Sequence, residues 1–233
     1  MATPGETGTR AALRWDAGAA GTEGGAAGTA ARATGARSFQ VRFHGRGGQG
    51  VVTAAELLSV AVFLEGRHAQ AFPSFGSERA GAPVAAFCRM SDSAIRTREP
   101  VVDPDAVVVQ DATLLGQVDL LSGLRPGGFL LVNTALGLER LGLGDVAAAL
   151  PRDHVATVAA TDVARRLIGR PVPNAALLGG LAALTRVVTL DALSAAIAQR
   201  FSGPTGAGNV AAATEVFADV LRAREELRVA PPA

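Results

Sequence analysis

The chain has 233 residues, of which 48% are hydrophobic and 18% are charged, and its formal net charge is +1. That length is sufficient for one α/β domain with a substantial core. The nearly neutral charge gives no electrostatic reason to expect nucleic acid or an anionic membrane as a partner. The sequence has no apolar run of membrane-spanning length and no apolar segment near its N-terminus of the kind that signal peptides carry. We therefore expect a soluble protein of the cytoplasm.

Two residue types are scarce or missing. Cys88 is the only cysteine, which excludes a cysteine-ligated iron–sulfur cluster, a cysteine-rich zinc site and an internal disulfide. Every residue in the Lys+Arg total is an arginine, so a P-loop lysine and a Schiff-base lysine are excluded as well. We expect this chain to bind no metal or cofactor by itself.

Both ends of the sequence are predicted to be extensions of the folded part. Residues 1–37 are rich in Ala, Gly and Thr, and Leu13 and Trp15 are their only large apolar side chains. Such a segment buries too little surface to offset its ordering entropy, so we predict disorder here and in a tail over 226–233. An organelle transit peptide is the alternative for the first segment, because it is rich in arginine and poor in acids.

The predicted domain, residues 38–225, opens with a strand over 40–44, a glycine-rich loop and a helix over 51–64. This helix is apolar around most of its circumference. One face is expected to pack on a sheet, which leaves the other available to a second subunit. The remaining predicted elements are strands near 67–71, 84–90, 106–109, 129–132 and 153–158, and helices over 161–169, 174–185, 190–200 and 207–224, with Thr161, Asn174 and Asp191 as caps.

The strands over 106–109 and 129–132 are continuous apolar runs, which suits strands covered on both faces. We therefore predict a single-domain α/β fold, a Rossmann-like three-layer sandwich with a largely parallel central sheet. Polar residues follow these two runs, at Gln110-Asp111 and Asn133-Thr134. Ligands of open α/β sheets bind at the carboxyl ends of the strands, so we expect the site there.

The loop between the first strand and the first helix satisfies G-x-G-x-x-G with Gly45, Gly47 and Gly50. Such glycines permit a tight turn, and the helix N-terminus favours an anion. A dinucleotide site is disfavoured, because no acid that could hold ribose hydroxyls occurs between Glu65 and Glu78. The other interpretation is structural: the glycines allow close helix–sheet packing and bind nothing.

Residues 71–84 form a second informative segment, in which prolines, glycines and phenylalanines surround Glu78-Arg79. This composition is typical of a shaped loop at an interface or binding site. Arg79 is suited to clamp a phosphate or carboxylate through its planar fork. A solvated surface arginine paired with Glu78 explains the same residues.

These motifs together resemble the gamma subunits of pyruvate and related 2-oxoacid:ferredoxin oxidoreductases. The resemblance covers roughly residues 38–220 and is carried by motifs in the family's order. They are Val41–Gly50 with Thr53-Ala54-Ala55, Ala69–Pro73, Phe75-Gly76, Glu78-Arg79, Gly81–Val84, Pro104-Asp105, Val109–Asp111, Asn133-Thr134, Gly169–Pro171 and Asn174. The family usually has two arginines where this chain has Arg79-Ala80. The sequence of Gly81–Val84 leans toward the pyruvate-type members.

The resemblance implies a reaction in which a 2-oxoacid, coenzyme A and oxidised ferredoxin give acyl-CoA, carbon dioxide and reduced ferredoxin. It also implies alpha, beta and delta subunits as partners, with thiamine diphosphate, Mg²⁺ and [4Fe-4S] clusters bound elsewhere in the complex and ferredoxin reached through it. The lone cysteine agrees with this division of labour. We expect the chain alone to be inactive.

Our hypothesis for the site is that the loop residues Gly45, Arg46, Gly47, Gly48, Gln49 and Gly50, together with Arg79, hold phosphates of coenzyme A. No catalytic residue and no metal ligand is assigned. Gln49 and Asp111 are further candidates for ligand contact, although loop closure and helix capping explain them equally well. His44 is expected to make a local hydrogen bond, and Cys88 to be a small buried apolar residue.

Three alternatives remain open at this point. The chain is a non-catalytic assembly module that binds no ligand, or it belongs to an indolepyruvate or branched-chain 2-oxoacid oxidoreductase of the same architecture. The third, a stand-alone nicotinamide-dependent dehydrogenase, is disfavoured by the missing acid. The sequence does not identify the oxoacid, the electron acceptor or the stoichiometry.

Overall fold

The structure is a computed structural model that describes residues 38–74, 81–97 and 99–229. Its centre is one six-stranded sheet with the strand order β2-β3-β1-β4-β5-β6. The strands are β1 (Ser38–Arg46), β2 (His68–Pro73), β3 (Pro83–Ser91), β4 (Ala106–Val109), β5 (Phe129–Asn133) and β6 (Val155–Val158).

The sheet is parallel except for β3. Strand β1 pairs in parallel with β4, β4 with β5, and β5 with β6, whereas β3 runs antiparallel to both of its neighbours. The carboxyl ends of β1, β4, β5 and β6 therefore meet at one edge of the sheet, as predicted. The predicted α/β class with a largely parallel sheet is confirmed.

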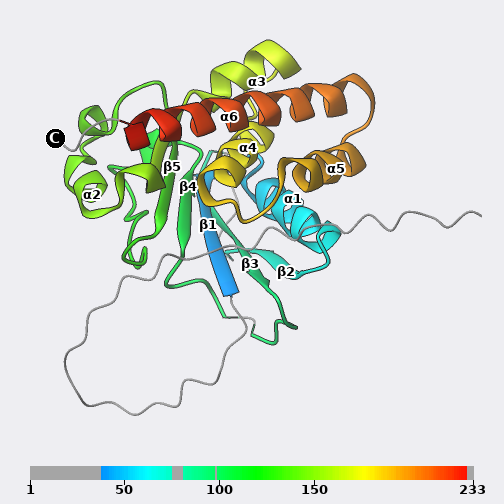
Figure 1. Ribbon diagram of the computed structural model, residues 1–233, viewed down its shortest axis with the longest axis horizontal. Coiled ribbons are helices and arrows are strands. Elements are labelled where there is room, and N and C mark those ends of the chain that lie inside the picture. The colour runs from blue at the N-terminus through cyan, green and yellow to red at the C-terminus, as the bar shows by residue number, and fades with distance from the viewer. Residues whose placement is uncertain (1–37, 75–80, 98, 230–233) are drawn as a thin grey trace, which may run out of the picture. The chain divides into compact units, whose positions relative to one another are not determined.

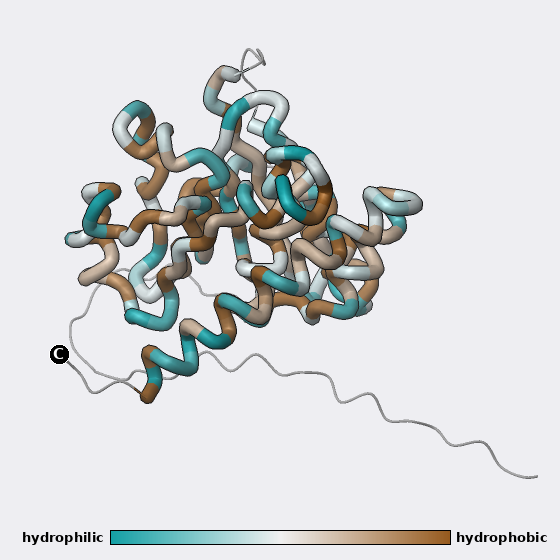
Figure 2. Tube along the Cα trace, turned by 90° about the horizontal axis from the view of Figure 1, so that it is seen from above, coloured by the Kyte–Doolittle hydropathy of each residue, from teal (hydrophilic) through white to brown (hydrophobic). Residues whose placement is uncertain are grey.

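The long helices cover one face of this sheet (Figure 1). They are α1 (Val51–Leu64), α3 (Ala160–Ile168), α4 (Asn174–Thr185), α5 (Leu190–Arg200) and α6 (Gly203–Val229). Hydrophobic and hydrophilic residues alternate along α6 (Figure 2), as expected for a helix with one face on the core and the other in solvent.

Helix α4 is the centre of the core, because all of its residues are buried. A Cβ on Gly179 would lie 1.9 Å from the carbonyl oxygen of Ala213 in α6, so the two helices approach backbone to backbone. A Cβ on Gly180 would lie 3.1 Å from Val216 in α6 and 3.3 Å from Leu131 in β5. Helix α4 is thus held between the sheet and α6 by two adjacent glycines.

The other face of the sheet is covered by a thinner third layer. Over β4 and β5 it consists of irregular chain and short helices, namely η1 (Ala112–Leu114), η2 (Leu138–Leu141) and α2 (Gly144–Ala149). The short helix η3 (Arg152–His154) instead contacts α4 and α6. On this face β1 carries the polar side chains of Arg42 and His44, because side chains alternate along a strand and Val41 and Phe43 point to the core on the helix side. Both side chains are nevertheless buried.

The helix caps are where our predictions were wrong. Helix α5 is capped by Thr189, whose hydroxyl accepts from the Ala192 amide, and Asp191 lies inside its first turn. Helix α4 begins at Asn174 itself. Helix α3 is reached by Asn133, whose Oδ1 accepts from the Thr161 amide. For α5 the capping residue is two positions before the predicted one, α4 has no side-chain hydrogen bond from its N-cap residue Pro173, and for α3 the acceptor comes from another strand.

The predicted strands and helices are all present, with ends that differ by a few residues. The main difference is at the C-terminus, where we predicted a helix to 224 and disorder from 226. Helix α6 instead continues to Val229. Residues 225–228 are Glu, Glu, Leu and Arg, which are strong helix formers, so propensity extends the helix beyond its packed part. The predictions for 1–37 and 230–233 lie outside the described residues.

Replacing Gly179 with Ala is expected to destabilise the protein by at least about 2 kcal/mol, because the new methyl group would overlap the Ala213 carbonyl and force α4 and α6 apart. Urea unfolding of the full chain measures this change. Gly144→Ala is the matched control, since Gly144 begins α2 and has nothing within 4 Å of an added Cβ. Equal stability of the two variants would contradict the packing that we describe.

Candidate functional site

The glycine loop joins β1 to α1 at the carboxyl edge of the sheet. Two of its glycines are required by geometry. Gly50 caps α1 with φ 76°, in the left-handed region that glycine adopts freely. A Cβ on Gly45 would lie 2.7 Å from Val51 Cγ2 and 2.9 Å from Gln49 Oε1. The loop therefore takes its tight course only because these positions lack side chains.

Gln49 closes the loop on itself. Its side-chain Oε1 accepts from the Arg46 backbone amide at 2.8 Å, and its backbone amide donates to the Arg46 carbonyl at 3.1 Å. Its carbonyl accepts from Gln110 Nε2 at 3.1 Å, so the loop is also tied to the end of β4. The loop closure that the sequence allowed for Gln49 is present in the structure.

Asp111 binds the loop from the end of β4. Its Oδ2 accepts from Gln49 Nε2 at 2.8 Å and from Arg46 Nε at 3.2 Å. Its Oδ1 accepts from the amide and hydroxyl of Thr113, so it also caps η1. Burial raises the pKa of Asp111, but the hydrogen bonds from Thr113 and Gln49 and the charge of Arg46 outweigh it, and the net pKa is lowered. The carboxylate stays ionised.

The guanidinium of Arg46 is partly exposed but is held by several groups of the protein. Besides Asp111, it donates through Nη1 to the Gly81 carbonyl at 3.1 Å and through Nη2 to Thr113 Oγ1 and Gln117 Oε1. Thr113 and Gln117 were missed by our reading of the sequence. Thr113 could have been found, because an aspartate two residues before a threonine is typical of a local turn that the carboxylate caps.

The loop presents backbone amides that the described chain does not use. The amides of Gly47 and Gln49 already donate to Ala82 and Arg46. No carbonyl or side chain in the described part of the chain accepts from the amides of Gly48 and Gly50. The first amides of α1 are also free, as at any helix N-terminus, and carry partial positive charge. This arrangement suits a phosphate or another anion.

A second helix begins beside this loop. Asn174, the first residue of α4, is only 2% exposed, and its Nδ2 lies 2.7 Å from the position of a Cβ on Gly50. Its Oδ1 accepts from the Ala175 amide. Sequence reasoning placed Asn174 as a cap but not next to the glycine loop, since their proximity depends on how α4 returns to the sheet.

The polar residues at the strand ends do gather, as predicted. Gln110 bonds the loop, and Asn133 Nδ2 donates to the Gln110 carbonyl at 2.8 Å and to Thr161 Oγ1 at 2.7 Å. A continuous set of amide side chains therefore links the ends of β1, β4 and β5 to the start of α3. Gln110 Oε1 is buried without a hydrogen-bond partner in the described part of the chain.

Arg79 lies outside the described residues, so its place in the site stays a prediction. Its chain neighbours Gly81 and Ala82 are described and are bonded to the loop. Gly47 donates to the Ala82 carbonyl at 2.9 Å, and Gly81 donates to the Gly47 carbonyl at 3.2 Å. Gly81 and Ala82 are thus anchored next to the glycine loop.

His44 and Cys88 are both buried. Burial, and secondarily the charge of Arg42, lower the pKa of His44 to about 4, against the opposing effect of the Leu120 backbone. Its Nε2 has no hydrogen-bond partner among the described residues. Cys88 is fully buried, and burial raises the pKa of its thiol. Cys88 is the small buried residue that we predicted.

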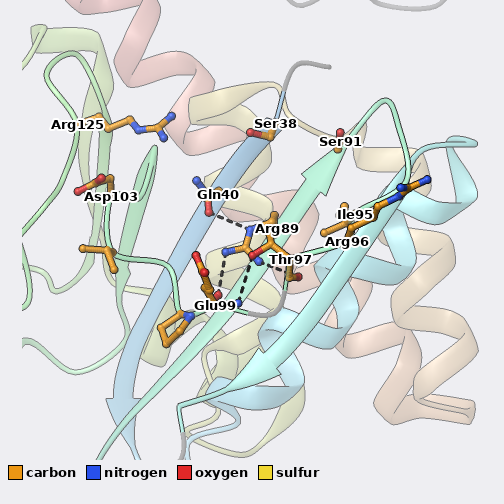
Figure 3. Close-up of a pocket in the computed structure, with 12 residues that line it drawn as sticks. Ser38, Gln40, Arg89, Ser91, Ile95, Arg96, Thr97, Glu99, Asp103 and Arg125 are labelled. Carbon is orange, nitrogen blue, oxygen red and sulfur yellow. Dashed lines mark hydrogen bonds between the residues drawn. The ribbon is translucent and has the colours of Figure 1, made fainter. Parts of the chain in front are cut away.

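A separate cavity of about 520 Å³ lies at the opposite end of the sheet, between β1, β3 and the chain that follows β3. Arg89 is its central residue (Figure 3) and is only 6% exposed. It donates to Gln40 Oε1 and to the carbonyls of Thr97 and Glu99. Because these acceptors belong to the cavity wall, we interpret Arg89 as the group that fastens this wall to the sheet.

The described residues contain neither a metal-binding cluster nor a membrane-spanning helix. Across residues 38–74, 81–97 and 99–229, no cluster of three or more His, Cys, Asp or Glu side chains could hold a metal ion. Within the same residues, no helix combines the length and the apolarity that crossing a bilayer requires.

The fold and the site define a class: an α/β protein with an anion-suited glycine loop at the carboxyl edge of a largely parallel sheet. A sequence model of the family described as pyruvate ferredoxin/flavodoxin oxidoreductase matches residues 40–218. The common gamma subunit of the pyruvate/ketoisovalerate oxidoreductases of Thermococcus kodakarensis is 46% identical over 181 residues, 77% of this chain and 95% of that protein. The chain belongs to this family.

Solved structures agree with the family. The crystal structure of pyruvate oxidoreductase subunit PORC from Thermotoga maritima is 35% identical with a TM-score of 0.66, and the match covers 78% of this chain and 96% of that one. The 2-oxoglutarate:ferredoxin oxidoreductase of Magnetococcus marinus, solved with 2-oxoglutarate, coenzyme A and succinyl-CoA bound, has a TM-score of 0.63 over 80% of this chain and 31% of that one. At 15% identity, this second likeness shows the fold alone.

The free energy of unfolding is expected to fall as the pH drops from about 6.5 to about 4, and His44→Gln should flatten part of this fall. The unfolded chain binds a proton at His44 below pH 6.5, whereas the folded protein does not until about pH 4. The contribution is therefore fully present above pH 6.5 and is lost toward pH 4, with an upper limit of about 3 kcal/mol. Urea unfolding at a series of pH values measures it.

His68→Gln is the control for this prediction, because His68 is exposed at the start of β2. If His44→Gln and the wild type lose stability in parallel across this pH range, the burial of a neutral His44 is not the cause.

Proposed function

We propose that this chain is the gamma subunit of a multisubunit, coenzyme A-acylating 2-oxoacid:ferredoxin oxidoreductase of the pyruvate type. The complex converts a 2-oxoacid, coenzyme A and oxidised ferredoxin into acyl-CoA, carbon dioxide and reduced ferredoxin. The observation that carries this proposal is the 46% identity to a gamma subunit over 95% of that subunit's length. The pyruvate oxidoreductase subunit from Thermotoga maritima supports the same assignment.

The residues of this chain favour a supporting part in that reaction. Its one cysteine is buried with a raised thiol pKa, so it is unsuited to ligate a [4Fe-4S] cluster. We therefore assign the clusters, thiamine diphosphate and Mg²⁺ to the alpha, beta and delta subunits, and the contact with ferredoxin to the assembled complex. A place in the cytoplasm agrees with this chemistry.

The glycine loop is the part of this chain that we assign to coenzyme A. The free amides of Gly48 and Gly50 and the N-terminus of α1 would bind its phosphates, with Arg46 or Arg79 adding positive charge. Holding the phosphates would aim the thiol at the adduct on a neighbouring subunit, which is a contribution of positioning and not of proton transfer. Coenzyme A in the distant Magnetococcus marinus enzyme, which shares this fold, is consistent with such a role.

A specific observation favours the second candidate function, a purely structural assembly subunit. The glycines of the loop are explained by close packing alone, since a side chain at Gly45 or Gly50 would overlap Val51 or Asn174. Copurification from the native host tests the assembly itself. Companion chains with a thiamine diphosphate site and ferredoxin-like cysteines would support both candidates, and a chain found alone would contradict both.

Replacing Arg46 or Arg79 with Ala in the assembled enzyme is expected to raise the KM for coenzyme A about tenfold, because each change removes a positive charge that we assign to the coenzyme A site. A tenfold change corresponds to about 1.4 kcal/mol of lost binding. Steady-state kinetics at saturating 2-oxoacid measures this effect.

Arg125→Ala is the matched control, since Arg125 is an exposed arginine paired with Asp105 at the other end of the sheet. If both the Arg46 and the Arg79 variants keep the wild-type KM, the loop is structural and the assembly function is preferred.

A further inference from the structure

A single carboxylate sets the course of the glycine loop. Asp111 Oδ2 accepts from Arg46 Nε at 3.2 Å and from Gln49 Nε2 at 2.8 Å, so one oxygen binds two residues of the loop from outside it. Asp111 Oδ1 is held by the amide and hydroxyl of Thr113 at 3.0 and 2.6 Å. The two bonds from Thr113 therefore fix the orientation of the carboxylate that binds the loop.

The two residues that Asp111 binds are also bonded to each other. Gln49 Oε1 accepts from the Arg46 amide, and the Gln49 amide donates to the Arg46 carbonyl. These contacts use the polar groups of Arg46 and Gln49 within the protein. The amides of Gly48 and Gly50 are left without an acceptor in the described part of the chain. The network thus leaves these two backbone amides available to a ligand.

The same network joins three segments that are far apart in sequence. Arg46 reaches the Gly81 carbonyl and also Thr113 and Gln117, while Gln110 holds the Gln49 carbonyl. The loop is consequently fixed both to Gly81 and to the start of the β4–β5 connection. A change at Asp111 would remove the bonds to Arg46 and Gln49 and leave the bond from Gln110 as the tie between the Gln49 carbonyl and the end of β4.

Removing the charge of Asp111 has opposite expected effects on anion binding, depending on whether the carboxylate acts by its charge or by holding the loop. A carboxylate beside an anion site repels the anion and cancels the charge of Arg46, so on electrostatic grounds alone its removal would strengthen anion binding. If its function is to hold the loop, its removal weakens binding, because the amides lose their fixed directions. The sign of the effect separates the two.

We propose that Asp111 is a positioning residue for coenzyme A, which acts through Arg46 and Gln49 to hold the glycine loop in its binding conformation. This inference rests on the proposed function of the loop. It gives Arg46 a place in the loop's framework in addition to the positive charge that it adds, and leaves direct contact with the phosphates to the backbone amides.

The test uses Asp111→Asn in the complete oxidoreductase complex. An asparagine that turns its oxygen to Arg46 and Gln49 loses the negative charge that pairs with Arg46 and the hydrogen bond from the Thr113 amide, and one that turns the other way loses both bonds to the loop. We expect the KM for coenzyme A to rise about tenfold, while the KM for the 2-oxoacid stays unchanged. An unchanged or lowered KM for coenzyme A would overturn the proposal.

Asp153→Asn is the matched control. Asp153 is likewise an aspartate in an ion pair, with Arg224 at 3.1 Å, and hydrogen bonds and neighbouring positive charge likewise lower its pKa although burial raises it. It lies in η3, ahead of β6 and therefore at the opposite end of the sheet. A general loss of stability would act in both variants, whereas a positioning effect acts only in Asp111→Asn.

Hydrogen exchange of the complex provides a readout that does not depend on coenzyme A. Asp111→Asn should speed exchange of the amides in residues 45–50, and Asp153→Asn should not. Faster exchange with an unchanged KM would overturn both this proposal and the assignment of coenzyme A to the loop. Unchanged exchange and KM in Asp111→Asn, with a raised KM in Arg46→Ala, would overturn only the role of Asp111.

Discussion

The face of β1 that points away from the helices depends on buried arginines. Irregular chain covers this face, and its backbone carbonyls must find donors once water is excluded. Arg42 Nη2 donates to the carbonyls of Leu120 and Ser122. Arg89 donates to the carbonyls of Thr97 and Glu99. A planar guanidinium reaches several carbonyls at once, which a lysine ammonium does less well. The sequence contains only arginines for this purpose.

The candidate site likewise contains an arginine that binds a backbone carbonyl, and it adds an ion pair. Arg46 continues the polar series along β1 and also binds a carbonyl, that of Gly81. Unlike Arg42 and Arg89, whose contacts within the described residues are to neutral oxygens, Arg46 forms an ion pair with Asp111. Its charge is therefore largely compensated, and the positive potential of the loop comes mainly from backbone amides and helix N-termini. Those groups cannot turn away from a ligand as a long side chain can.

The sequence predicted the elements well because their periodicity is local. The apolar run of β4 and the nearly uniform apolarity of α1 depend on burial alone, and burial repeats with the period of the element. The convergence of Gln110 and Asn133 was also predictable, since parallel strands bring their carboxyl ends to one edge. By contrast, the predicted caps were wrong. Thr189 and Asp191 both suit the N-terminus of α5, and Asn133 reaches α3 from a different strand.

The roles of charged residues were harder to predict than their positions. From the sequence, Arg46 is an arginine in a glycine loop and suits an anion. In the structure the hydrogen bonds of its guanidinium go to Asp111, Thr113, Gln117 and Gly81, all more than thirty residues away along the chain. Sequence separation of that size leaves no local pattern. The outward face expected for α1 is present at Phe63, which is 72% exposed, although nothing in the structure identifies what covers it.

The pKa values of Asp111 and His44, titratable groups near the loop, lie away from neutral pH, and this limits the proton transfer that the chain can contribute. The pKa of Asp111 is lowered by its hydrogen bonds and by Arg46, so it remains a carboxylate. The pKa of His44 is lowered to about 4 by burial and by Arg42, so it remains neutral. Neither group exchanges a proton readily at physiological pH. A site whose ionisable groups are fixed in one state offers shape and potential to a ligand rather than proton transfer.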